Sequence, residues 1–255
     1  MRTPIVAGNW KMNKLTDEAR KLAGDVAEAA PALDEVELVL GPTFVSLPAV
    51  SEEIGEADVG LSAQNVHWSN SGAYTGEISP EMLTDVGCTH AIIGHSERRQ
   101  YFGETDVSVN RRARAALEGD LTPIICVGES LAERSAGETE LKIKLQTRAA
   151  LSEVDPEEAR DVIIAYEPLW AIGTGETATP EQAQQAHATI RGLIADIYDD
   201  GVADDVRILY GGSVKPHNID GLIEKPDLDG ALIGGASLQA DSFLSIARSV
   251  QDYQT

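Results

Sequence analysis

The sequence predicts an α/β protein built as one (β/α)8 barrel, with eight parallel strands ringed by helices in a single domain over residues 1–255. Its length of 255 residues suits this architecture, which commonly reaches about 250 residues as one domain. Short apolar runs alternate with amphipathic stretches along the whole chain, and no Pro-, Gly- or Ser-rich linker interrupts them. A doubly wound open sheet shows the same alternation, but eight strand–helix units favour closure into a barrel.

Eight short runs rich in apolar and β-branched residues predict the strands. Several of these runs are apolar throughout instead of alternating with polar residues. That pattern is typical of parallel strands that are covered on both faces. The predicted strands are Ile5–Asn9, Val36–Gly41, Val59–Gln64, His90–Gly94, Pro123–Val127, Val162–Tyr166, Val206–Tyr210 and Gly230–Ile233.

Helix signals lie between the predicted strands. Thr16 is the expected N-cap of a first helix, because apolar residues recur after it at helical spacing. A later helix is predicted to begin at Thr179, with Pro180 in its first turn and Gln182 placed to bond back to the cap. The Ser96–Arg99 stretch after the fourth strand predicts a short helix.

The net charge of the chain limits the classes of molecule that it is expected to bind. The chain carries 42 Asp and Glu against 20 Lys and Arg, a net charge of −22, which predicts an acidic surface. Nucleic acids and anionic membranes are polyanions, so neither is expected as a partner. This charge is typical of proteins from a salty cytoplasm, although drift in composition gives the same result.

The cysteines and the apolar runs indicate the compartment. Cys88 and Cys126 form no C-x-x-C pair and are too few for a disulfide framework. The N-terminal apolar run is too short for a signal peptide, and no run approaches the roughly 20 residues of a membrane helix. A cytoplasmic protein is therefore expected.

Chemistry-bearing side chains gather at the ends of the predicted strands, where barrel enzymes carry their catalytic groups. Lys11, His95 and Glu167 each follow such an end. Taken singly, Lys11 fits a solvated loop lysine and His95 a hydrogen-bonded histidine without a catalytic role. Glu167 ends an apolar run directly before Pro168, and a carboxylate there is costly unless it is paired or used.

Glycine turns follow the last two predicted strands, at Gly211–Gly212 and Gly234–Gly235. Barrels bind phosphate with backbone N–H groups at this place. The sequence holds no Walker motif and no G-x-G-x-x-G after a strand, and its five histidines lack metal-ligand spacing. Neither a cofactor nor a catalytic metal is expected.

At these positions the chain strongly resembles the triosephosphate isomerase family. The resemblance covers nearly the whole chain, and its motifs stand in family order. The matching segments are Gly8–Asn13, Ala63–Asn65, Gly72–Ile78, Ile93–Arg99, Ala165–Gly175, Tyr210–Val214 and Leu232–Ala236.

The resemblance implies interconversion of dihydroxyacetone phosphate and D-glyceraldehyde 3-phosphate through an enediol(ate), without cofactor or metal, in glycolysis and gluconeogenesis. Glu167 matches the family's general base, and His95 matches the electrophile that polarises the carbonyl as a neutral imidazole. Lys11 matches a cation near the phosphate and the oxyanion, Asn9 a polar contact beside it, and Glu97 a supporting partner.

Further positions follow from the same resemblance. Pro168 to Glu176 matches the family's lid, with Glu176 where a lysine is common, and Asn65–Ile78 matches a loop that forms a homodimer. Thr75 would then approach the partner's site. The positions that match the family's phosphate grip are Gly173, Ser213, Gly234 and Gly235.

Two other classes of function fit parts of the pattern. A Schiff-base aldolase, as another phosphate-binding barrel enzyme, would keep the glycine turns but needs a lysine inside the barrel. The predicted strands contain none. A non-catalytic scaffold of the same fold should have lost Lys11, His95 or Glu167, and all three are present.

Overall fold

Eight parallel strands close into a barrel in the computed structural model, which describes residues 2–172 and 176–254. Each strand pairs with the next in the chain, and the last strand returns to pair with the first, with Ile5 opposite Gly230. The barrel is therefore confirmed over the open sheet. The strands are β1 (Ile5–Asn9), β2 (Glu37–Gly41), β3 (Val59–Ala63), β4 (His90–Ile93), β5 (Thr122–Val127), β6 (Ile163–Tyr166), β7 (Arg207–Tyr210) and β8 (Gly230–Ile233).

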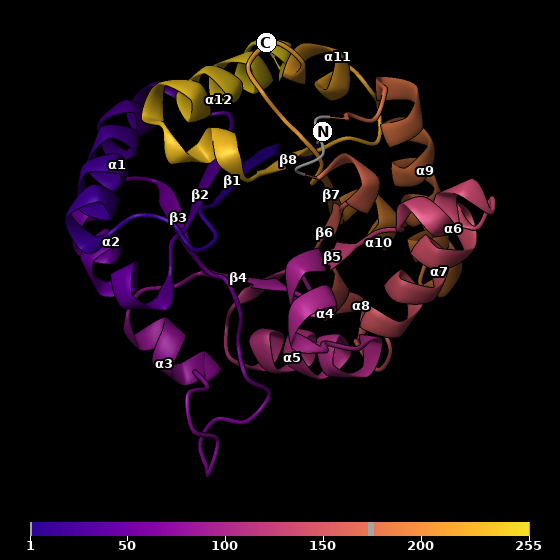
Figure 1. The fold of residues 1–255 in the computed structure, drawn as a ribbon, viewed down its shortest axis with the longest axis horizontal. Helices are drawn as coiled ribbons and strands as arrows, with labels where there is room; N and C mark the ends of the chain where they lie inside the picture. The colour runs from indigo at the N-terminus through magenta and orange to yellow at the C-terminus, as the bar shows by residue number, and fades with distance from the viewer. Residues whose placement is uncertain (1, 173–175, 255) are drawn as a thin grey trace.

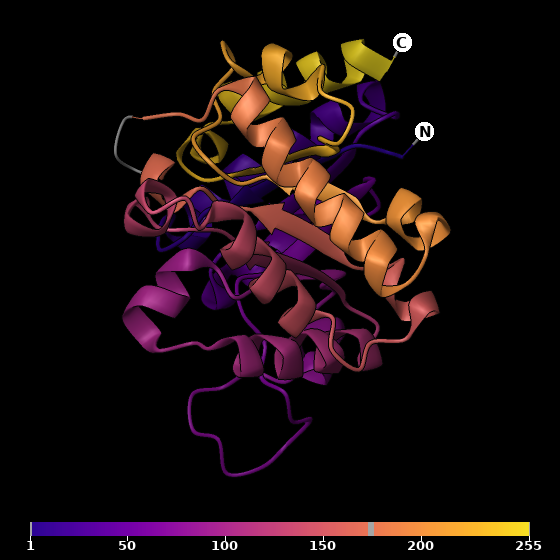
Figure 2. The same cartoon turned by 90° about the vertical axis from the view of Figure 1, so that its right-hand side faces the viewer.

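The helices form an outer ring around the strands, as Figure 1 shows down the barrel and Figure 2 from the side. Within the described residues, none of these helices is both long enough and apolar enough to cross a membrane. The helices are α1 (Thr16–Ala29), α2 (Leu47–Ile54), α3 (Pro80–Asp85), α4 (Ser96–Phe102), α5 (Asp106–Glu118), α6 (Leu131–Ser135), α7 (Thr139–Ala150), α8 (Pro156–Ala159), α9 (Pro180–Ile197), α10 (Asp200–Asp205), α11 (Ile219–Ile223) and α12 (Ala240–Gln254).

The predicted starts of two helices have different outcomes. The start of α9 is confirmed, because Thr179 accepts the Gln182 N–H at 3.2 Å and Gln182 accepts the Thr179 N–H at 3.0 Å. The prediction for α1 is wrong, because Thr16 is the first helical residue and Leu15 occupies the cap. Leu15 has no side-chain oxygen, and the Glu18 carboxylate accepts its N–H at 2.8 Å instead.

Two apolar layers explain why the strands are apolar throughout. Alternate strand residues, such as Ile163 and Ala165 of β6, belong to a cluster that fills the barrel. The residue between them, Ile164, packs in a second and larger cluster with residues of the surrounding helices. Both faces of each strand are thus buried, as expected for a parallel sheet inside a ring of helices.

Gly230 begins β8 at the seam where the barrel closes. Its φ is +127°, a conformation that side-chain-bearing residues rarely adopt. A Cβ on Gly230 would also overlap the carbonyl oxygen of Ile5, its neighbour on β1. The closing pair of strands therefore requires glycine at this position.

The segment between β3 and α3, residues 64–79, projects beyond the ring of helices in both ribbon views (Figure 1, Figure 2). A hydrogen bond from the His67 N–H to the Ile78 carbonyl, 2.8 Å long, ties its two ends together. The tip from Asn70 to Glu77 is exposed. The segment is therefore anchored at its base, where Arg112 of α5 donates to Asn65 and Val66, while its tip is open to solvent.

His187 of α9 is fully buried between the helix layer and the barrel. Its Nδ1–H donates to the Asp227 carbonyl at 3.1 Å, and its ring lies edge-on to Tyr166 with centroids 5.9 Å apart. Burial lowers the pKa of His187 from 6.5 to about 4. The folded protein therefore keeps this ring neutral at a pH where the unfolded chain protonates it.

We expect His187 to make stability depend on pH between 6.5 and 4. Its full contribution is present above pH 6.5, and about 3 kcal/mol is lost as the pH falls to 4, because the unfolded chain binds the proton first. Urea unfolding at pH 7 and pH 5, with His187→Gln as the comparison, measures the effect. The wild type should lose about 2 kcal/mol more than the variant, whereas equal losses would contradict the prediction.

Candidate active site

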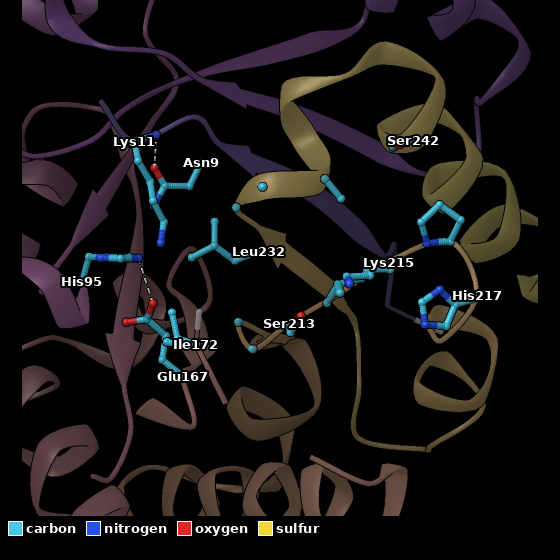
Figure 3. A pocket seen from close by; sticks show the side chains of 17 residues that line it. Asn9, Lys11, His95, Glu167, Ile172, Ser213, Lys215, His217, Leu232 and Ser242 are labelled. Atoms are coloured by element: carbon cyan, nitrogen blue, oxygen red, sulfur yellow. Dashed lines mark hydrogen bonds and ion pairs between the residues drawn. The ribbon is translucent and has the colours of Figure 1, made fainter. Parts of the chain in front are cut away.

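A cavity of about 500 Å³ opens at the carboxyl ends of the strands. Figure 3 shows Asn9, Lys11, His95 and Glu167 along one side of it, with Ser213 and Leu232 across from Lys11 and His95. Asn9 is the last residue of β1, and Glu167 directly follows β6. The fold thus brings together side chains that are 158 positions apart in the chain, between 9 and 167.

His95 and Glu167 form the most buried polar pair of this cavity, with exposed fractions of 6% and 2%. The His95 Nε2 lies 2.9 Å from the Glu167 Oε1. The second carboxylate oxygen, Oε2, accepts the Ser96 N–H at 2.8 Å. Glu167 is therefore held by two donors that both come from the start of α4.

The local chain explains how His95 is presented. Gly94 follows β4 with a φ of +68°, which turns the chain into α4. His95 is the N-cap of that helix, and its Nδ1 accepts the Glu97 N–H at 3.2 Å. Because Nδ1 accepts, the proton of the neutral ring sits on Nε2 and points at Glu167.

The environment sets the ionisation of this pair. Burial alone would raise the pKa of Glu167, but the adjacent His95 ring and the Ser96 N–H outweigh it and hold the pKa below its usual value. Burial lowers the pKa of His95, but the Glu167 and Glu97 carboxylates together outweigh it and raise the pKa above its usual value. The Glu97 N–H on Nδ1 opposes a second proton on the ring, so this hydrogen bond favours the neutral tautomer.

Lys11 is held in an unusual conformation, with a φ of +51°. Its N–H donates to the Asn9 Oδ1 at 3.0 Å, and its carbonyl accepts from the Gln64 Nε2 at 2.9 Å. Its Nζ reaches Glu97 at 2.7 Å. Positive φ in a non-glycine residue costs free energy, and such residues cluster at functional sites. These contacts aim the ammonium into the cavity beside His95 (Figure 3).

The glycine turns line the cavity next to these side chains, since a Cβ on Gly211 would lie 2.9 Å from the Glu167 Cγ and one on Gly234 3.3 Å from the Lys11 Cε. Ser213, Gly234 and Gly235 all line it, together with Gly211 and Gly212. Two other predicted positions are not among the described residues that line the cavity. Thr75 is exposed in the projecting segment and does not line the cavity. Gly173 falls outside the described residues.

The structure adds residues that the sequence did not single out. Glu129 is completely buried beside the lid segment, with its carboxylate accepting from Tyr166 Oη at 3.1 Å and from Trp170 Nε1 at 2.9 Å. Its position just after β5 is the same signal that identified Glu167 after β6. Lys215 and His217 also line the cavity, and their nearness to the Gly211–Gly212 turn could have indicated them.

Among the residues that the structure describes, no group of three His, Cys, Asp or Glu side chains is arranged to hold a metal ion. Lys11, His95 and Glu167 supply instead a cation, an N–H donor and a carboxylate within one cavity. Such a set moves protons and stabilises negative charge.

A closed parallel barrel with these side chains at the carboxyl ends of its strands defines the class of protein as a (β/α)8-barrel enzyme. A family model described as triosephosphate isomerase matches residues 4–250. The chain belongs to the triosephosphate isomerase family.

Relatives from several bacteria support the same assignment, and all three below are named triosephosphate isomerase. The protein from Chloroflexus aurantiacus is 55% identical over 246 residues, covering 96% of this chain and 98% of the relative. That from Geobacter metallireducens is 52% identical, with 96% and 98% covered. That from Trichlorobacter lovleyi is 50% identical, with 97% and 99% covered.

Proposed function

We propose that the protein interconverts dihydroxyacetone phosphate and D-glyceraldehyde 3-phosphate, a step of glycolysis and gluconeogenesis. The observation that carries the proposal is the pairing of His95 and Glu167 beside Lys11, with glycine turns lining the same cavity. The reaction needs a base for a carbon-bound proton, a donor for the carbonyl oxygen and a grip on phosphate. This cavity offers all three.

Glu167 acts as the general base in this mechanism. Its lowered pKa keeps the carboxylate ionised at neutral pH. The carboxylate leaves its two donors, takes the proton from C1 of the ketose and forms the enediolate. Returning that proton to C2 gives the aldose, so the carboxylate is regenerated and no cofactor is consumed.

His95 and Lys11 act on the oxygens. The His95 Nε2–H gives its proton to the carbonyl oxygen on C2, and Nε2 then takes the proton of the hydroxyl on C1, which restores the neutral ring. When Glu167 turns to the substrate, the carboxylate that raises the pKa of His95 most is withdrawn, and burial, the largest influence on this ring, lowers its pKa. Lys11 stabilises the negative charge that develops on the enediolate.

The phosphate is bound by backbone N–H groups of Ser213, Gly234 and Gly235, with Gly173 as a fourth contact from the lid. Glycines allow the backbone to approach an anion closely. Pro168 to Glu176 closes over the bound substrate, because an enediolate phosphate exposed to water eliminates phosphate.

A coupled assay from glyceraldehyde 3-phosphate to dihydroxyacetone phosphate tests the proposed function. Borohydride added with substrate should trap no protein adduct, since the eight described strands contain no lysine for a Schiff base. Trapping with loss of activity would favour an aldolase. Substrate binding without turnover would favour a non-catalytic scaffold.

We infer that the protein acts as a homodimer through residues 65–78. A second cavity of about 300 Å³ lies beside the active site, lined by Lys11, Gln64, Asn65 and Glu97 among others. The apolar side chains of Met12 and Phe102 line it as well and are 93% and 69% exposed in the single chain. The projecting segment of a second copy, with Thr75 at its tip, would cover them and buttress Lys11.

Deleting residues 69–72 should therefore give monomers with low activity. The deletion shortens the tip but leaves His67 and Ile78, whose hydrogen bond closes the base of the segment. Sedimentation velocity and the coupled assay give the two readouts. A shortened protein that stays dimeric and fully active would refute both the interface and the role of Thr75.

We further propose that residues 1–255 form one domain and that the enzyme is cytoplasmic. The pairing of β1 with β8 supports a single domain, because both ends of the chain are needed to close the barrel. Cys88 and Cys126 are buried free thiols, which suits a reducing compartment.

A further inference from the structure

Another cavity, of about 600 Å³ and called the rear cavity below, also borders Glu167, the proposed base. Glu167 lines both this rear cavity and the substrate cavity, so its backbone forms part of the wall between them. Gly128, just after β5, and Gln146 of α7 line the rear cavity as well. Contacts that hold the chain in this wall therefore also determine the position of the Glu167 carboxylate.

Gly128 is the closest support of the Glu167 backbone. A Cβ on Gly128 would overlap the carbonyl oxygen of Glu167, so the two main chains are in direct contact. Beside it, the Glu167 N–H donates to the Val127 carbonyl at 2.7 Å. A displacement of the chain at Gly128 is therefore passed directly to Glu167.

Gln146 holds Gly128 from the helix layer. Its side-chain Oε1 accepts the Gly128 N–H at 2.7 Å, and only 4% of Gln146 is exposed. A buried N–H without an acceptor destabilises the folded protein. If the Gln146 acceptor were removed, the chain at Gly128 would therefore shift until its N–H met another acceptor. The amide thus connects α7 to the barrel rim at one defined point.

We propose that Gln146 is a positioning residue for the isomerisation: through Gly128 it sets where the Glu167 carboxylate stands relative to the substrate. The proposal rests on the proposed function of Glu167 as the base. It predicts an effect on turnover and little effect on substrate affinity, because the turns proposed to bind the phosphate follow β7 and β8 and do not line the rear cavity.

Gln146→Met keeps the length and burial of the side chain but removes the acceptor. We expect kcat to fall about tenfold, since a displacement of about 1 Å costs roughly 100-fold and a smaller shift is expected here. KM should stay within about twofold.

Thr147→Val is the matched control, because Thr147 is the next residue of α7, is fully buried, and has a hydroxyl without a partner among the described residues. Its kcat should match the wild type.

Gln146→Glu tests whether the hydrogen-bond acceptor or the packing of the side chain matters for turnover. It also provides a test if Gln146→Met does not fold. Its carboxylate can accept the Gly128 N–H, so kcat above pH 8 should return to within about twofold of the wild type. It also adds a negative charge to the cavity that Glu167 lines, which raises the pKa of Glu167 and moves the acid limb of the pH profile up by about one unit. Arg99, Glu133 and Lys142 line the same cavity and are unchanged in every variant.

The results separate this proposal from the proposed function. If the wild type is active and Gln146→Met loses turnover at constant KM while Thr147→Val does not, the positioning role holds. Equal kcat in Gln146→Met and Thr147→Val, or a Gln146→Glu enzyme whose kcat above pH 8 is as low as that of Gln146→Met, would overturn it and leave the isomerase activity untouched. An inactive wild type would instead contradict the proposed function.

Discussion

Replacing Glu167 with aspartate is expected to lower kcat by about 100-fold or more. Aspartate keeps the charge but withdraws the carboxylate by one methylene, and a misplacement of about 1 Å can cost roughly 100-fold in rate. KM should change by less than about twofold, because the groups that bind the phosphate are not altered. The coupled assay, run over a range of substrate concentrations, gives both constants.

Glu181→Asp is the control for this prediction. Glu181 lies in the exposed first turn of α9, where it pairs with Lys225 at 2.8 Å, and it does not line the cavity. It should keep wild-type kinetics. A Glu167→Asp enzyme with near-normal kcat would remove Glu167 from the role of base, whatever the control shows.

Gly230→Ala is expected to have the largest effect on stability, with a loss of at least about 4 kcal/mol. The methyl group would overlap the Ile5 carbonyl at the β1–β8 seam, and the φ of +127° would be strained as well. Neither strand can retreat without breaking the closing ladder. Chemical denaturation monitored by circular dichroism measures the loss, or shows that the protein no longer folds.

Gly137→Ala isolates the effect of the seam. Gly137 also has a positive φ, of +75°, but a Cβ there would meet nothing within 4 Å. Only the conformational cost remains, and it should be about 1 kcal/mol. If the two alanine variants lost similar stability, steric closure at the seam could not be the reason.

The strand pattern could be predicted closely because each strand is buried on both faces. Strands β1 and β8 match the prediction at both ends, and each of the other six differs by one residue at one end. The start of α9 was equally readable, since Thr179 and Gln182 bond to each other within one turn. The start of α1 was not, because Leu15, which has no side-chain acceptor, occupies the N-cap that Thr16 was expected to fill, and the Glu18 carboxylate accepts its N–H.

The candidate site likewise has a part that the sequence predicts and a part that it does not. Lys11, His95 and Glu167 could be predicted from their places at strand ends. The contacts that orient them could not, because they join residues far apart in the sequence. Gln64 reaches the Lys11 carbonyl across 53 positions, and Gly128 meets Gln146 across 18 positions from a helix to a strand end. Such partners are fixed by closure and packing, and no local pattern identifies them.

Barrel closure also completes the candidate active site, which exists only once the first and the last strand have paired. Asn9 and Lys11 follow the first strand, while Gly234 and Gly235 follow the eighth, and all four line one cavity. During synthesis on the ribosome the first strand must therefore wait for nearly the entire chain before its neighbour arrives. Contacts of such long sequence separation form slowly. Recovery of catalysis during refolding would report on this final event, whereas recovery of helical signal would report on earlier ones.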